Sequence, residues 1–188
     1  DVAGGLVGLN DGTVSHAYYA GNVTGNWTVG GLVGVNHGAV SNSYSTGGVT
    51  GDGNVGGLVG LSDGTVSDSY SCGNVTGDYH VGGLVGGNRG TVSDSYSTGS
   101  VAGYSDVGGL VGWNEDGTVR KSFWDIETSR QSTSDGGTGK NTTEMQDIAA
   151  FSGAGWSIVA VANPGIRNPA GIWNIVDGET YPFLSWRP

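Results

Sequence analysis

The sequence predicts an all-β fold, a β-solenoid of about five 26-residue coils followed by a small mixed C-terminal cap. The pentapeptide Gly-Gly-Leu-Val-Gly occurs five times at a constant spacing of 26 residues, beginning at Gly4, Gly30, Gly56, Gly82 and Gly108. A fixed period of roughly 20–50 residues is typical of stacked-repeat proteins. Valine, tyrosine and threonine dominate the segments between glycines, and no segment has the i, i+3, i+4, i+7 apolar spacing of a helix.

Within each repeat, short extended segments alternate with Gly, Asn and Asp, which are turn residues. Three columns recur in register: Asn10, Asn36, Ser62, Asn88 and Asn114; Val14, Val40, Val66, Val92 and Val119; Tyr18, Tyr44, Tyr70, Tyr96 and Phe123. We expect three short strands per coil and a coil spacing of about 4.8 Å, so that each residue stacks on its equivalent.

Strand alternation leaves the direction of two apolar columns open. In the segment from Val29 to Gly34, the valines share one parity and Leu32 has the other, yet both columns are apolar in all five copies. Either the glycine pair breaks the alternation with a bulge around a narrow core, or one apolar ladder points outward and packs against a partner. On the second reading Leu6 is an interface residue.

The periodicity ends after Phe123, so we divide the chain into a repeat solenoid, 1–119, and a C-terminal capping segment, 120–188. Residues 124–141 are polar and glycine-rich and are expected to form a loop. Thr143 to Gln146 resembles a capping box that leads into a short helix. Residues 156–162 predict a strand, and residues 172–175 and 181–186 predict a hairpin or paired strands.

The motif Gly-Gly-Leu-Val-Gly-x-Asn-x-Gly-x-Val-x-x-Ser-Tyr-Ser-Thr-Gly resembles the GLUG-motif repeat over residues 1–119. The resemblance implies a secreted, surface-displayed module of the kind found in large bacterial and archaeal surface proteins, including adhesins. It brings no catalytic residues. A similar Phe-Trp-Asp and Tyr-Pro-x-Leu-x-Trp tail follows repeats in relatives of this family, which favours a capping role for the aromatic C-terminal segment.

The charge distribution narrows the range of partners. The net charge is −10, and residues 1–119 hold ten Asp or Glu against one Arg, which gives −9. An acidic surface repels nucleic acid and anionic membranes, and no stretch of about 20 apolar residues predicts membrane insertion. We expect an extracellular or cell-surface location in a bacterium or archaeon. Expected partners are surface glycans or a host or neighbouring cell-surface protein.

Catalytic and metal sites are poorly supported. His16, His37 and His80 occupy different columns, and Arg89 is the only basic residue that could accompany a carboxylate cluster in the repeats, so we expect no enzyme and no cofactor. Asp68 and Asp94 share one column. Calcium binds six to eight clustered oxygens and no Asp-x-Asp-x-Asp loop is present, so solvated aspartates are favoured over a Ca²⁺ site, which stays the alternative.

Other candidate residues lie in the aromatic C-terminal segment and in glycosylation sequons. The ligand or interface candidates are Trp173, Tyr181 and Trp186, which belong either to a cap that plugs the open end of the rod or to a sugar-binding platform. The sequons are Asn22, Asn26, Asn74 and Asn141, and the Asn-Val-Thr sequence is also simply part of the repeat.

The leading functional hypothesis is a non-enzymatic extracellular module, a rigid stalk or adhesin-type repeat for cell-surface attachment. The alternative is a self-assembling subunit of a filament or surface layer, because Asp1 opens inside a repeat without a polar cap and an open coil edge offers unpaired strand hydrogen bonds for end-to-end docking. A further alternative is a carbohydrate-binding module that uses hydroxyl ladders or the cap aromatics.

Overall fold

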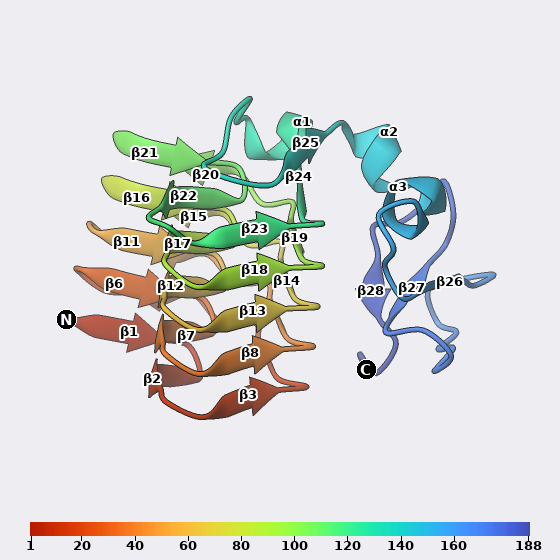
Figure 1. Cartoon of the computed structure of the whole chain (residues 1–188), viewed down its shortest axis with the longest axis horizontal. Coiled ribbons are helices and arrows are strands. Elements are labelled where there is room, and N and C mark those ends of the chain that lie inside the picture. The colour runs from red at the N-terminus through yellow and green to blue at the C-terminus, as the bar shows by residue number, and fades with distance from the viewer. The chain divides into compact units, whose positions relative to one another are not determined.

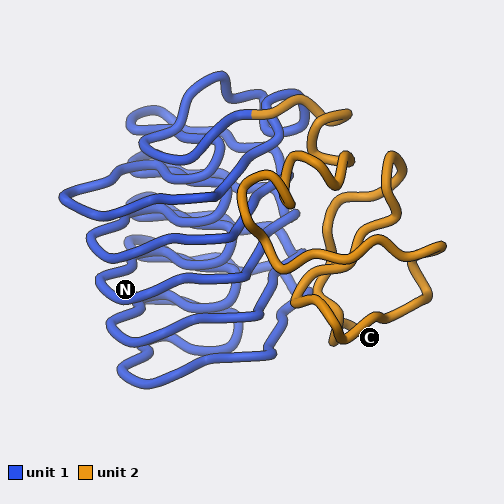
Figure 2. Tube along the Cα trace, turned by 45° about the vertical axis from the view of Figure 1, so that its right-hand side comes forward, with its two compact units in different colours: residues 1–139 blue, residues 140–188 orange.

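The computed structural model describes residues 1–188, which form two compact units, Asp1–Gly139 and Lys140–Pro188. Figure 2 colours the two units separately. The first unit runs past residue 119 because β24 (Phe123–Asp125) continues the stack, with Phe123 paired to Tyr96. The expected loop at 124–141 is therefore wrong in part: this segment also contains α1 (Ile126–Ser129) and β25 (Thr138–Lys140).

The first unit is the predicted parallel β-solenoid, and Figure 1 shows its coils stacked from β1 to β24. Equivalent strands of successive coils pair in parallel and in register, residue i with residue i+26, as in Val29 with Val55. One inserted residue makes the offset 27 for β23 and β24, as in Tyr96 with Phe123. Sheet 1 contains β1 (Val2–Gly4), β6 (Thr28–Gly30), β11 (Asn54–Gly56), β16 (Tyr79–Gly82) and β21 (Ser105–Gly108). Sheet 2 contains β2 (Val7–Asn10), β7 (Val33–Asn36), β12 (Val59–Ser62), β17 (Val85–Asn88) and β22 (Val111–Asn114).

Three further sheets complete the coils. Sheet 3 contains β3 (Thr13–Ser15), β8 (Ala39–Ser41), β13 (Thr65–Ser67), β18 (Thr91–Ser93) and β23 (Thr118–Arg120). Sheet 4 contains β4 (Tyr18–Tyr19), β9 (Tyr44–Ser45), β14 (Tyr70–Ser71), β19 (Tyr96–Ser97), β24 and β25. Sheet 5 contains β5 (Val23–Thr24), β10 (Val49–Thr50), β15 (Val75–Thr76) and β20 (Val101–Ala102).

A complete coil therefore has five short strands, and the prediction of three was wrong. One additional corner lies between sheets 3 and 4, where a non-glycine residue adopts a left-handed conformation with φ between 47° and 51° in every coil. These corner residues are His16, Asn42, Asp68, Asp94 and Lys121. The other lies at the glycine pair between sheets 1 and 2. Each corner ends a strand after two to four residues.

Both apolar columns of the glycine-rich segment point into the protein, and they enter two separate cores. Val29 belongs to a core of valines with Val23, Val49, Val55, Val75, Val81 and Val101. Leu32 belongs to a second core with Val33, Val40, Leu58, Val59, Val66, Leu84, Val85, Val92, Leu110, Val111 and Trp124. In the three coils above the first, Leu32, Leu58 and Leu84 are fully buried, so an outward leucine ladder is excluded there.

The two cores are separated by a close approach of sheets 1 and 2, which explains the glycines between them. A Cβ atom on Gly34 would lie 2.7 Å from the Gly8 carbonyl oxygen and 2.9 Å from the Ala3 carbonyl oxygen. A Cβ atom on Gly56 would clash with the Val59 carbonyl oxygen and lie 2.6 Å from the Gly86 nitrogen. Only glycine permits this backbone contact.

Polar side chains inside the coils form ladders that run along the stack. In the asparagine ladder (Asn10, Asn36, Ser62, Asn88, Asn114), Asn10 Nδ2 donates to Asn36 Oδ1 at 2.8 Å and Asn88 Nδ2 donates to Asn114 Oδ1 at 2.7 Å. In the serine ladder (Ser43, Ser69, Ser95, Ser122), each hydroxyl oxygen accepts the backbone N–H of the equivalent residue one coil below, at 3.1–3.2 Å. These buried polar groups are thus paired between coils, with Asn88 Oδ1 as the exception.

The second unit is a small mixed fold. It contains α2 (Thr142–Met145), α3 (Ile148–Ser152), β26 (Ile158–Ala160), β27 (Trp173–Ile175) and β28 (Phe183–Leu184). The predicted pairing near the C-terminus is confirmed, because β27 and β28 are antiparallel. The capping box lies two residues earlier than predicted: Asn141 is the N-cap and exchanges hydrogen bonds with Glu144.

Candidate functional site

The variable edge of the solenoid is the segment that leads into, and includes the first residues of, strands β6, β11, β16 and β21 of sheet 1. We define it as residues 26–28, 52–54, 78–80 and 104–106, which read Asn-Trp-Thr, Asp-Gly-Asn, Asp-Tyr-His and Tyr-Ser-Asp. The columns that follow hold valine and then glycine in these four coils, and Ala3 and Gly4 in the first coil. Because the remaining columns of this sheet are nearly invariant, the variable edge is a place where side chains differ without changing the scaffold.

The backbone of the variable edge is held by a repeated pair of hydrogen bonds. The carbonyl oxygen of Asp52 accepts the N–H groups of Asp78 at 3.2 Å and Tyr79 at 2.9 Å. The carbonyl oxygen of Asp78 accepts those of Tyr104 at 3.0 Å and Ser105 at 2.9 Å. Each loop is therefore fixed on the loop below it, and the side chains project from a preorganised backbone.

Large aromatic side chains are exposed along this edge. Trp27 is 62 % exposed, Tyr79 47 % and Tyr104 85 %. The rings of Tyr79 and Tyr104 pack edge to face, with 6.4 Å between centroids and 77° between planes. Exposing aromatic rings to water forgoes the free energy of burial, so a row of them makes this edge a candidate binding surface.

His80 connects the variable edge to the outer face of sheet 2. Its ring stacks on Trp113 with 4.9 Å between centroids and 14° between planes. Its Nδ1 lies 3.1 Å from Asn54 Oδ1, and its Nε2 lies 3.5 Å from Asp106 Oδ2. Both ring nitrogens thus have partners from adjacent coils, which fixes the orientation of the imidazole and of the indole against it.

His80 and Asp106 also depart from the repeat in their backbone. Their φ angles are 47° and 54°, whereas their equivalents Thr28 and Asn54 do not have positive φ. A left-handed conformation costs a non-glycine residue roughly 1 kcal/mol or more. The variable edge therefore differs in backbone as well as side chains between the lower and upper coils.

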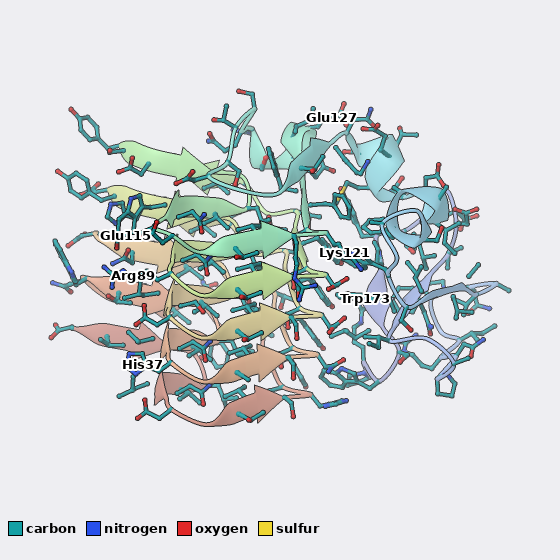
Figure 3. The ribbon with its side chains drawn as sticks, viewed as in Figure 1. His37, Arg89, Glu115, Lys121, Glu127 and Trp173 are labelled. Atoms are coloured by element: carbon teal, nitrogen blue, oxygen red, sulfur yellow. The ribbon has the colours of Figure 1, made fainter.

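A charged ladder lies in the turn that follows the asparagine ladder. Its residues alternate in sign along the stack when His37 is protonated: Asp11, His37, Asp63, Arg89 and Glu115. His37 Nδ1 lies 2.9 Å from Asp11 Oδ1, and Arg89 Nε donates to Glu115 Oε2 at 2.8 Å. Figure 3 shows Arg89 and Glu115 close together and His37 farther along the same side. The Arg89 guanidinium also lies 5.5 Å from the Trp113 ring centroid.

The aromatic candidates from the C-terminal segment lie in the second unit. Trp173 is fully buried and packs on Trp156, with 4.9 Å between ring centroids. As placed, Trp173 presents no ring face to a ligand and contributes to the core of its unit. Tyr181 and Trp186 are half-buried. Leu6, the interface candidate of the first coil, is 53 % exposed.

The four sequon asparagines have different surroundings. Asn22 and Asn74 are exposed, and their Oδ1 atoms accept the N–H groups of Gly48 and Ser100 one coil above. Asn26 is exposed on the variable edge. Asn141 is half-buried and caps α2.

Residues considered for metal binding do not gather. No group of three or more His, Cys, Asp or Glu side chains is close enough to hold a metal ion. Asp68 and Asp94 are corner residues whose left-handed backbone turns the chain between sheets 3 and 4. Their recurrence in one column therefore has a conformational reason, since Asp and Asn tolerate positive φ better than most residues.

Taken together, the in-register coils and their internal ladders define a β-solenoid repeat module. The family described as "Glug: The GLUG motif" matches residues 25–50 and 77–102, and each match spans one 26-residue coil. These two coils therefore match the GLUG motif, as the sequence predicts. Residues 51–76, between the matches, pair in register with both neighbouring coils. Neither a curated protein nor a solved structure matches the chain.

Proposed function

We propose that this GLUG solenoid is a non-enzymatic module of the cell exterior, a rigid stalk or adhesin-type segment that holds a binding surface away from the cell. GLUG repeats are typical of extracellular proteins, which supports the location. No helix has the length and apolar character needed to cross a membrane. The excess of acidic residues in the repeats suits a hydrated exterior surface.

The observation that carries the proposal is the contrast between an invariant interior and a variable edge. Successive coils are joined by backbone pairing in five sheets and by the asparagine and serine ladders. Bending the stack would break several of these bonds at once, so the unit resists bending. A scaffold of this kind maintains fixed spacing between exposed side chains, which is what a stalk or adhesin requires.

The experiment is a retention assay with beads. Beads coated with the whole chain are allowed to settle on bacterial, archaeal and animal cell layers, and the bound fraction after washing is compared with that of albumin-coated beads. The proposal expects retention above the albumin control on at least one surface. Equal retention on every surface would refute the adhesive role.

Self-assembly is a second candidate, because the backbone groups of a terminal coil can pair with a coil of a second copy. Val2, Leu6 and Leu9 are 50–54 % exposed, whereas Leu32, the equivalent of Leu6 in the next coil, is fully buried. A further coil, from a second copy or from the same polypeptide, would pair with the first coil. Sedimentation velocity over a concentration series tests the intermolecular case: growing oligomers support it, and a constant monomer excludes it.

A further inference from the structure

We propose that the variable edge binds a neutral glycan chain that lies along the axis of the stack, with Trp27, Tyr79 and Tyr104 as the platforms for its sugar rings. This inference deepens the adhesive function proposed above and rests on it. It places the binding surface on the repeats and not on the C-terminal aromatic residues.

The chemistry of the edge matches the two-sided character of a sugar. The C–H bonds on one side of a pyranose ring form an apolar, weakly positive patch that stacks on the negative face of an aromatic ring. The hydroxyl groups around the ring need hydrogen-bond acceptors and donors. Asp52, Asp78 and Asp106 are exposed carboxylates beside the aromatic residues, and carboxylates accept hydroxyl hydrogen bonds.

The spacing along the edge favours a polymer over a single sugar. Trp27 and Tyr79 occupy one column two coils apart, which is about 9.6 Å at ordinary strand spacing. Gly53 lies between them, and a Cβ atom there would clash with the Trp27 carbonyl oxygen and lie 3.1 Å from Trp27 Cδ2, so glycine accommodates both the backbone and the indole of Trp27. Tyr104 extends the row in the next coil. An extended oligosaccharide running across the strands meets successive rings.

Charge selects the class of glycan. The three carboxylates of the edge, and the excess of acidic residues throughout the repeats, repel sialic acids, uronic acids and sulfated sugars. Neutral hexoses and N-acetylhexosamines carry no such penalty. A protein partner is less suited to this surface, because the centres of protein interfaces are depleted of charged residues, whereas acidic side chains lie among the aromatic ones here.

The test uses the whole chain and immobilised oligosaccharides of glucose, galactose, mannose and N-acetylglucosamine, with sialylated and sulfated glycans on the same array. Calorimetry then gives the affinity for the best-bound neutral oligosaccharide. The proposal expects Tyr79→Ala/Tyr104→Ala to weaken binding roughly tenfold to a hundredfold and to leave the thermal midpoint nearly unchanged, because both rings are exposed. It also expects the longer oligosaccharides to bind better than the monosaccharides.

The matched control is Tyr18→Ala, which removes an exposed tyrosine (49 %) from sheet 4 of the first coil. Binding that survives this change and fails in the double variant supports the proposal. Three results overturn it: no neutral glycan binds, charged glycans bind better than neutral ones, or the double variant binds as well as the wild type. Beads that adhere to cells stripped of glycans, without binding on the array, would overturn the glycan site and leave the adhesive function standing.

Discussion

The asparagine ladder has one gap, and filling it should stabilise the protein. Ser62 replaces asparagine in the third coil, and its hydroxyl accepts a hydrogen bond from Asn36 Nδ2 at 3.2 Å. On its other side, the buried Asn88 Oδ1 has no hydrogen-bond partner. The backbone of Ser62 already pairs in register with the backbones of Asn36 and Asn88, so Ser62→Asn places an asparagine side chain in the ladder. The new Nδ2 would donate to Asn88 Oδ1, as Asn10 Nδ2 does to Asn36.

The expected gain follows from the cost of an unpaired buried acceptor. Leaving such a group unsatisfied costs about 1–3 kcal/mol, and ordering a longer side chain offsets up to about 1 kcal/mol of the gain. We expect Ser62→Asn to raise the free energy of unfolding by about 1 kcal/mol. In a protein of this size that corresponds to a rise of about 2–4 °C in the thermal midpoint.

Calorimetry and urea unfolding measure the effect, with Ser67→Asn as the matched control. Ser67 lies in sheet 3 of the same coil, outside the asparagine ladder, so this change should leave the midpoint within about 1 °C. A midpoint for Ser62→Asn equal to or below that of the wild type would refute the ladder argument. An equal rise in both variants would assign the gain to asparagine content and not to the ladder.

Three further predictions concern the scaffold. Leu58→Ala removes a side chain of the buried leucine column and should lower the free energy of unfolding by about 2–5 kcal/mol. Leu6→Ala changes a half-exposed residue of the first coil and should lower it by less than about 1 kcal/mol. Urea unfolding of the two variants measures the difference. Gly56→Ala should abolish folding, as seen by far-ultraviolet circular dichroism, because its Cβ would clash with the Val59 carbonyl. Gly12→Ala, which meets nothing within 4 Å, should fold normally. A double-mutant cycle on Arg89 and Glu115 should give a coupling of about 0.2–1 kcal/mol that shrinks in 1 M salt; a salt-independent coupling would contradict a Coulombic ladder.

The fold could be predicted because a periodic sequence in a solenoid stacks each residue on its own equivalent. Strand counting failed for a physical reason. The left-handed corner at Asn42 and the glycine pair at Gly30 and Gly31 each divide an extended segment into two strands. No change in the hydrophobicity of the residues marks either division in the sequence. The presence of two cores could not be predicted from the sequence either. Which core Val29 and Leu32 enter depends on how closely sheets 1 and 2 approach each other.

Part of the candidate site can be recognised in the sequence when the repeats are compared column by column, although the overall composition does not reveal it. His37 looks isolated when compared only with the other histidines, yet its column places Asp11 and Asp63 directly beside it. Comparing the repeats column by column also exposes Trp27 and Tyr79 as departures from the pattern. The burial of Trp173, in contrast, required coordinates, because aromatic residues suit a core and a binding platform equally well.

The proposal that an invariant scaffold presents an adhesive edge is tested most directly by a bead-retention assay with three proteins. The assay uses a cell layer that retains beads coated with the wild type. The three proteins are the wild type, Tyr18→Ala and Tyr79→Ala/Tyr104→Ala, each first shown to be folded. The account predicts that beads carrying the wild type and Tyr18→Ala are retained equally and that beads carrying the double variant fall to the albumin level. Equal retention of all three would contradict it.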